Sequence, residues 1–200
     1  MKKQRSRSQK SKPLTTRAKE SLPQTPPKAT DQKQPPKVQG RQATPDRTPS
    51  PGAQRVIDTC QDVFDKVPGA RSDCNKFVKL VCDKLDANSF SDSDNADSIT
   101  NHIRDVGWCA HNGWTQLNRD PQKAKDSAEQ GQLIVAGATG NDLKQAHGHV
   151  VVVVGSKGLW KGYPYASWGK LGGVGKTNAR MTVAYKLADL AKVSYMTKKV

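Results

Sequence analysis

The most regular hydrophobic pattern of the chain lies in residues 71–85, where apolar side chains recur at three- and four-residue intervals: Phe77, Val78, Val81, Cys82 and Leu85. This spacing predicts one face of a helix, and Ser72 or Asp73 stands just before it as an N-cap residue. Cys74 therefore falls in the first helical turn. Unpaired backbone N–H groups and the helix dipole favour an anion there, so we expect a lowered thiol pKa and a nucleophilic cysteine. The alternative is a small cysteine that only packs at a helix end.

Other parts of the chain also carry helical patterns, namely residues 55–67, a segment with Ile99, Ile103 and Val106, and residues 124–128. The first of these helices is stopped by Pro68 and is expected to pack beside the Cys74 helix. The acid- and serine-rich residues 86–97 could be proposed as a calcium loop, but they lack the glycine and the terminal glutamate of an EF-hand. We predict a solvated loop that ends in a helix cap at Asp94 or Asn95.

The second half of the chain has strand patterns in residues 132–137, 149–154, 159–168, 181–187 and 193–196. The unbroken valines of residues 150–154 indicate a strand that is covered on both faces. Pro164 interrupts the third strand, residues 141–145 form a polar turn, and the last strand is expected to close the sheet. Helices followed by strands with hairpin-length links predict an α+β fold with an antiparallel sheet.

Charge is distributed unevenly along the chain, whose formal net charge is +15. Residues 1–50 hold 13 Lys and Arg, 3 acidic residues and 8 prolines. We therefore expect residues 1–52 to be a disordered basic tail and residues 53–200 to be the folded domain. The tail could bind nucleic acid, but it has no aromatic side chains to stack on bases, so a linker or delivery segment is favoured. We expect neither a signal peptide nor a membrane span, since no long apolar run occurs.

Neither a metal site nor a nucleotide cofactor is expected. The four cysteines, Cys60, Cys74, Cys82 and Cys109, have no paired C-x-x-C spacing. If Cys74 stays free, at most one disulfide can form among the others, and Cys82 is predicted to lie in the core. Residues 172–177 read Gly-Gly-Val-Gly-Lys-Thr, but Lys170 stands where a P-loop has its first glycine. We predict that residues 170–176 form a glycine-rich loop at the rim of a site.

Cys74 and a histidine form the most specific chemical combination in the sequence. A thiol catalyses acyl transfer when an imidazole can take its proton and return it to the leaving amine. His149 begins the valine strand, and His147 precedes it with its side chain expected to point the same way. The residue pattern leaves both histidines open. In either case the backbone N–H of Cys74 would face the developing oxyanion.

Several sequence motifs together resemble those of a known family: Asp-Cys-Asn-Lys-Phe-Val at residues 73–78, residues 131–137, Gly-His-Val at 148–150 and Tyr-Pro at 163–164. They are similar to the NlpC-type papain-like peptidoglycan hydrolases, and among these to the amidase effectors of type VI secretion. The resemblance covers about residues 55–185. It implies a papain-like fold with the cysteine on N-terminal helices and the histidine on the sheet. It also implies a cysteine amidase that cuts peptide stems of peptidoglycan, at the bond between D-glutamate and meso-diaminopimelate, with Cys74 as nucleophile and His149 as base.

The resemblance further implies a polar third catalytic side chain on the strand after the histidine. That position falls at Ser167 or Trp168, and we predict Ser167, because an indole can only donate a hydrogen bond. The substrate site is expected to include Asp73, Trp114, Gly148 and Tyr163. Core packing is the commoner fate of a tryptophan such as Trp114 in a small domain.

A toxin of this type would leave the producing cell through a secretion machine, act in the periplasm of a neighbouring bacterium, and have a cognate immunity protein and a secretion-tube or spike component as partners. A phage-type lysin fits the same pattern. Two other functions stay open. One is a basic protein that binds nucleic acid or another polyanion through its tail and has a non-catalytic domain. The other is a cysteine hydrolase that acts on a protein or lipid amide.

Overall fold

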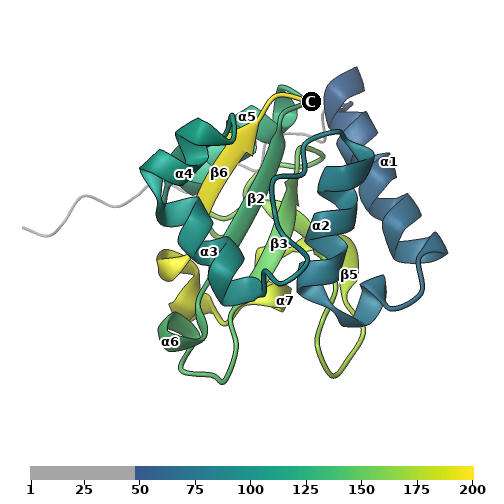
Figure 1. Ribbon diagram of the computed structural model, residues 1–200. Coiled ribbons are helices and arrows are strands. Elements are labelled where there is room, and N and C mark those ends of the chain that lie inside the picture. Colours follow the sequence, from purple (N-terminus) through teal and green to yellow (C-terminus); the bar gives the residue numbers. More distant parts are fainter. Residues whose placement is uncertain (1–47) are drawn as a thin grey trace, which may run out of the picture. The chain divides into compact units, whose positions relative to one another are not determined.

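A computed structural model describes residues 48–200 (Figure 1). Most of the predicted basic tail, residues 1–52, lies outside the described residues. The first helix, α1 (Pro51–Lys66), begins four residues before the predicted segment 55–67. The Ser50 hydroxyl caps it by accepting from the backbone N–H of Ala53 at 3.2 Å, and Pro51 occupies the first turn, where its missing N–H costs nothing.

The sheet has six strands in the order β1-β6-β2-β3-β4-β5, and every neighbouring pair is antiparallel. The strands are β1 (Thr115–Asn118), β2 (Leu133–Ala138), β3 (His149–Val154), β4 (Tyr165–Trp168), β5 (Lys176–Arg180) and β6 (Ser194–Lys198). This confirms the predicted α+β class with an antiparallel sheet. Strand β6 pairs with both β1 and β2, so the C-terminal strand fills the interior of the sheet, where we expected it to close the sheet.

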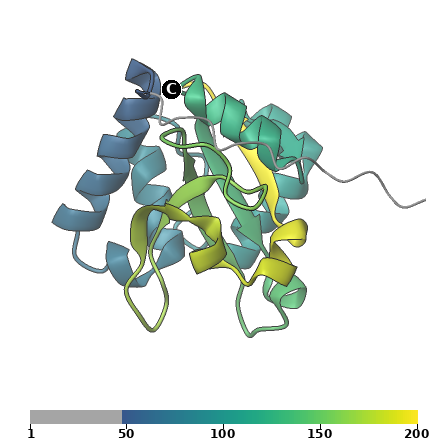
Figure 2. The ribbon, with the colours of Figure 1, turned by 180° about the vertical axis from the view of Figure 1, so that it is seen from behind.

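Helices cover both faces of the sheet. On the face seen in Figure 1 lie α1, α2 (Cys74–Lys84), α3 (Ala96–Arg104) and α4 (Val106–His111). The other face, seen in Figure 2, carries α5 (Pro121–Glu129) and the helical turns that follow β5. Alternate valines of β3 enter two separate cores, Val150, Val152 and Val154 in one and Val151 and Val153 in the other. The valine run therefore marks a strand buried on both faces, as predicted.

Four local predictions differ from the structure. Helix α3 ends at Arg104, and Val106 begins a separate helix, because Asp105 caps a new helix start by accepting from the backbone N–H of Trp108. The side chain of Val106 does not join the apolar face of α3, and the residue is 65% exposed. Residues 181–187 form no strand but contain the turn α7 (Met181–Ala184), followed by a 3₁₀ helix (Leu187–Lys192). Residues 159–164 form a tight turn, so β4 begins only after Pro164. Residues 141–145, predicted as a polar turn, contain one helical turn, α6 (Gly140–Leu143).

The acidic loop before α3 holds a lysine. The ammonium of Lys79 donates to the backbone carbonyls of Ser91, Asp92 and Asp94 at 2.8 to 3.3 Å. The backbone oxygens of this loop therefore already bind a cation that belongs to the protein. Asn95 caps α3, as one of the two predicted cap positions. Within residues 48–200, no helix has the length and hydropathy needed to cross a membrane.

Candidate functional site

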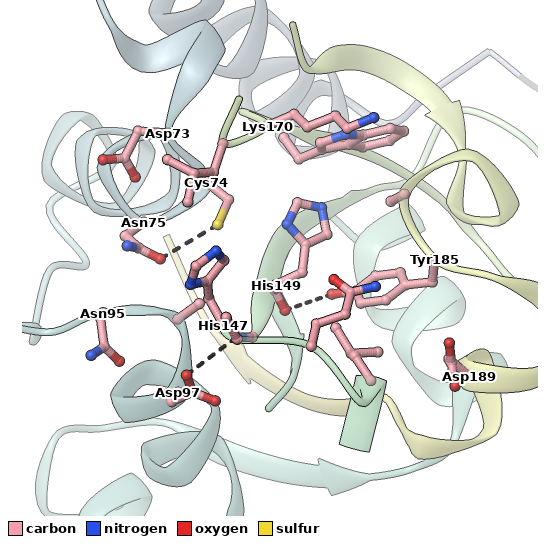
Figure 3. Close-up of a pocket in the computed structure, with 18 of the residues that line it drawn as sticks. Asp73, Cys74, Asn75, Asn95, Asp97, His147, His149, Lys170, Tyr185 and Asp189 are labelled. Atoms are coloured by element: carbon pink, nitrogen blue, oxygen red, sulfur yellow. Dashed lines mark hydrogen bonds between the residues drawn. The ribbon is translucent and has the colours of Figure 1, made fainter. Parts of the chain in front are cut away.

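Cys74 and His149 line the same pocket, which has a volume of about 560 Å³ (Figure 3). Its walls come from the start of α2, the start of α3, the loop that joins β2 to β3, and the segment after β5. Lys170 and Leu171 also line it, so the glycine-rich loop lies at its rim, as predicted. The fold thus brings together the two residues that the sequence analysis paired, although they are 75 positions apart in the chain.

The start of α2 is fixed by its own sequence. Asp73 is the N-cap, and its carboxylate accepts from the backbone N–H of Lys76 at 2.9 Å. Cys74 is the first helical residue, at the end where backbone N–H groups have no partner within the helix. This confirms the predicted position of the cysteine.

After β4 ends at Trp168, the chain turns away from β3 and packs against the start of α2. The backbone N–H groups of Lys170 and Gly175 both donate to the carbonyl of Arg71, at 3.0 and 2.8 Å. A Cβ at Gly169 would collide with the carbonyl oxygens of Ala70 and Asp73, so only glycine fits there. The paired residues of β3 and β4 begin only at Val152, and the first part of β3 is left open toward Cys74.

The Cys74 thiol is shielded from water, and this reverses the predicted change in its pKa. Burial, the largest influence, raises the pKa of Cys74, and the Asp73 carboxylate raises it further. Backbone N–H groups of Val150, Cys74 and Asn75 lower it, so the expected effect of the helix start is present but is outweighed. In the resting site the thiol donates to Oδ1 of Asn75 at 3.4 Å.

The His149 imidazole is held by aromatic rings. Its centroid lies 5.2 Å from that of Tyr185 and 6.5 Å from that of Trp168, both in edge-on geometry. The Tyr185 hydroxyl donates to the backbone carbonyl of His149 at 2.8 Å. Burial lowers the pKa of His149 to about 4, and the nearby charge of Lys170 contributes. The imidazole is therefore neutral at pH 7 and can accept a proton from the thiol.

The second histidine, His147, also lines the pocket, and its side chain is exposed. Figure 3 shows the sulfur of Cys74 directed toward the space between the rings of His147 and His149. Only His149 has its ring packed against aromatic neighbours. A packed ring keeps its orientation, which is what a base in catalysis requires.

Ser167 does not lie beside His149, so its predicted role is corrected. Its hydroxyl is buried on the other face of the sheet, where it accepts from the backbone N–H of Asn178 at 2.9 Å and contacts Cys60. The cause is the strand register, since Ser167 stands opposite Val152, whose side chain lies in the core under α1 and α2. Within residues 48–200, no side chain accepts a hydrogen bond from the His149 ring.

Two of the four predicted substrate-binding residues line the pocket and two do not. Asp73 and Gly148 are part of its wall. Trp114 is only 3% exposed and packs against Phe90 in the core, the alternative noted for a tryptophan in a small domain. Tyr163 is packed against the second core and also lies outside the pocket.

Among the pocket residues that were not predicted from the sequence are Asn75, Asp97 and Tyr185. Asn75 follows the cysteine directly, and its position in the first helical turn could have indicated it. Asp97 and Tyr185 reach the pocket only through tertiary contacts.

The acidic and the basic side chains around the pocket differ in the partners that they have within the protein. Asp73 caps α2, Asp97 accepts from two backbone N–H groups, and Asp189 pairs with Lys192 at 2.8 Å. Lys170 and Lys186 form no ion pair with any residue from 48 to 200. The Asp189 carboxylate is thus neutralised by an ion pair, and Asp73 and Asp97 keep their charge while they accept from backbone N–H groups. The ammonium groups of Lys170 and Lys186 are available to acidic groups of a ligand.

All four cysteines are free thiols. Burial raises the pKa of Cys60 to about 12 and that of Cys109 to about 11, and it also raises the pKa of Cys82. Cys82 lies in the core, as predicted. Cys74 is the only one of the four that lines the pocket.

No protein-family model matches the sequence, and a search of curated proteins finds no match.

Proposed function

We propose that the protein is a cysteine amidase that hydrolyses the peptide stems of bacterial peptidoglycan, with Cys74 as nucleophile and His149 as general base. The observation that carries the proposal is the shared pocket, in which the first residue of a helix supplies a thiol and the first residue of a strand supplies a neutral imidazole. A papain-like arrangement of the NlpC type has the same two elements.

The reaction follows from the protonation states of the pair. His149 takes the proton from the Cys74 sulfur as the sulfur attacks the amide carbonyl, and the oxyanion is stabilised by the backbone N–H of Cys74, which the helix does not use. The imidazolium then gives its proton to the leaving amine as the C–N bond breaks and a thioester forms. Water, deprotonated by His149, cleaves the thioester to a carboxylate and restores the thiol.

The substrate class is supported by the sequence resemblance and by two lysines of the pocket that have no ion pair among residues 48–200. Lys170 and Lys186 can pair with carboxylates of a ligand, and stem peptides with D-glutamate and diaminopimelate carry carboxylates. We propose the bond between these two residues as the cleavage site. An antibacterial toxin, exported by type VI secretion into the periplasm of a target cell and blocked by an immunity protein in the producer, is the biological role that the resemblance suggests.

The test is digestion of purified peptidoglycan by the wild-type protein and by Cys74→Ala, with the soluble fragments identified by mass spectrometry. The wild type is expected to release stem fragments with a new carboxylate on one side and a new amine on the other, and Cys74→Ala to release none. The fragment masses identify the bond. Equal digestion by both proteins would rule out Cys74 as nucleophile, and no digestion by a folded wild type would rule out this substrate.

A further inference from the structure

A carboxylate from a distant helix holds the loop that contains His147 and leads directly into His149. Asp97, in the first turn of α3, accepts from the backbone N–H of Gly140 through Oδ1 at 2.6 Å and from that of Gly148 through Oδ2 at 3.2 Å. Gly140 begins the loop between β2 and β3, and Gly148 ends it. One carboxylate therefore joins both ends of the loop (Figure 3 shows the contact with Gly148).

The loop is folded too tightly to take side chains at these two positions. A Cβ at Gly140 would lie 2.7 Å from the carbonyl oxygen of Gln145 and 3.0 Å from the carbonyl carbon of His147. A Cβ at Gly148 would lie 2.6 Å from the carbonyl oxygen of Ala138. The glycines bring the backbone so close that both N–H groups converge on the same carboxylate.

The position of Gly148 makes this contact relevant to the site, because both of its neighbours in the chain are histidines: His147 precedes it and His149 follows it. Other contacts hold the loop elsewhere. Arg104 pairs with Asp142 at 2.6 Å on the α6 turn, and Tyr185 reaches the carbonyl of His149. Among the described residues, Asp97 alone supplies a side chain to the N–H of Gly148.

Building on the proposed function, we propose that Asp97 is a positioning residue that sets the His149 imidazole against the Cys74 thiol by fixing the peptide of Gly148. A carboxylate suits this task because both of its oxygens only accept, so it satisfies two N–H groups at once. An asparagine has one accepting oxygen and would turn an NH₂ group toward the second N–H. An alanine releases both ends of the loop.

The test compares Asp97→Ala and Asp97→Asn with a matched control, Asp94→Asn. Asp94 lies three residues earlier, accepts from the backbone N–H of Ser91 at 2.8 Å and contacts His102, but it does not line the pocket. Two rates are measured for each folded protein: turnover of peptidoglycan fragments, and alkylation of Cys74 by iodoacetamide at pH 7, quantified by peptide mass. All four cysteines are buried, but only Cys74 lines the pocket, and peptide mass distinguishes its labelling from that of the other three.

Displacement of a catalytic group by about 1 Å lowers rates by about 100-fold. We expect Asp97→Ala to lower kcat and the alkylation rate at pH 7 by roughly 10- to 100-fold. Its KM should stay within about twofold of the wild-type value. Both rates of Asp97→Asn should lie between those of Asp97→Ala and the wild type. Asp94→Asn is expected to lower Tm without changing either rate. At pH 10 hydroxide generates the thiolate and no base is needed, so Asp97→Ala and wild type should be alkylated equally.

Two results would overturn the role of Asp97: wild-type rates in Asp97→Ala and Asp97→Asn at pH 7, or a loss of alkylation that is as large at pH 10 as at pH 7, which would indicate general damage to the pocket. Failure of the proposed function looks different. In that case the wild type leaves peptidoglycan uncut, while the alkylation of Cys74 still depends on Asp97 at pH 7 and not at pH 10, which supports the positioning role.

Discussion

The two sides of the pocket are built by different kinds of contact. The Cys74 side is local, because the cap of α2 is formed by Asp73 and Lys76, three residues apart. The His149 side depends on residues distant in the sequence: Asp97 holds the preceding peptide from 51 residues away, and Tyr185 holds the His149 carbonyl from 36 residues away. A change on the first side should therefore act through the helix end and the thiol, and a change on the second through the orientation of the imidazole.

The largest effect is expected from removing the base. His149→Ala should lower kcat by about 100- to 10,000-fold, the usual contribution of a general base. His147→Ala, two residues earlier in the loop before β3, is the matched control and should retain most of the activity, because its ring lacks the aromatic packing of His149. Initial rates of fragment release measure both. A large loss in His147→Ala together with an active His149→Ala would reverse the assignment.

The pH dependence should report the neutral imidazole. Because the pKa of His149 is lowered to about 4, kcat/KM should keep its value as the pH falls through 6.5 and decline only near pH 4. Removing the nearby charge in Lys170→Ala should move this decline to higher pH. A decline centred at 6.5 in the wild type would contradict the buried, neutral histidine.

The same shift affects folding stability. Between pH 6.5 and about 4 the unfolded chain binds a proton at His149 that the folded protein does not, so stability falls as the pH is lowered, by up to about 1.4 kcal/mol per pH unit. Above pH 6.5 this contribution is constant. Urea unfolding at pH 7 and pH 5 should show a smaller difference for His149→Gln than for the wild type, and an identical difference would argue against the lowered pKa.

Two variants of Asp73 distinguish its role as the N-cap of α2 from the effect of its charge on the pKa of Cys74. Asp73→Asn keeps a good N-cap, so stability should change little, but it removes a carboxylate that raises the pKa of Cys74. Alkylation of Cys74 at pH 8 should therefore be faster than in the wild type. Asp73→Ala loses the cap as well and should cost about 1 kcal/mol in urea unfolding. Slower alkylation in Asp73→Asn would contradict the direction of the charge effect.

The smallest effect on activity is expected at Ser167. Since its hydroxyl lies on the sheet face away from His149 and accepts from Asn178 N–H, Ser167→Ala should cost about 1 kcal/mol of stability and leave kcat within about twofold. Thermal unfolding and fragment release measure the two quantities. A loss of kcat comparable to that of His149→Ala would restore Ser167 as a catalytic residue.

The same local and distant contacts decide what could be predicted from the sequence. Neighbouring residues determine the apolar face of α2, its cap and the valine strand. Cys74 and His149 could therefore be placed at the starts of their helix and strand from the sequence. Strand β1 has a single apolar residue, Leu117, and no alternation, so it gave no signal. The turn α7 was predicted as a strand because Met181, Val183 and Tyr185 alternate with other residues. Val183 is exposed, and the buried pair Met181 and Tyr185 has the four-residue spacing of a helical turn.

Properties that depend on tertiary packing could not be predicted. The side of the sheet on which Ser167 lies follows from the β3–β4 register, and the raised pKa of Cys74 follows from burial that no local pattern reveals. The contacts of Asp97 with the loop also depend on tertiary packing. An acidic residue in the first turn of a helix is common, and the sequence does not show that this one accepts from two N–H groups of a distant loop.

The central claim is that His149 serves Cys74 as its base, and the rate of Cys74 alkylation as a function of pH tests it without assuming a substrate. The wild type should be labelled faster than His149→Ala at pH 7, and the two curves should converge as hydroxide takes over at high pH. Superimposable curves over the whole range would mean that the imidazole does not act on the thiol, and the proposed catalytic pair would be wrong.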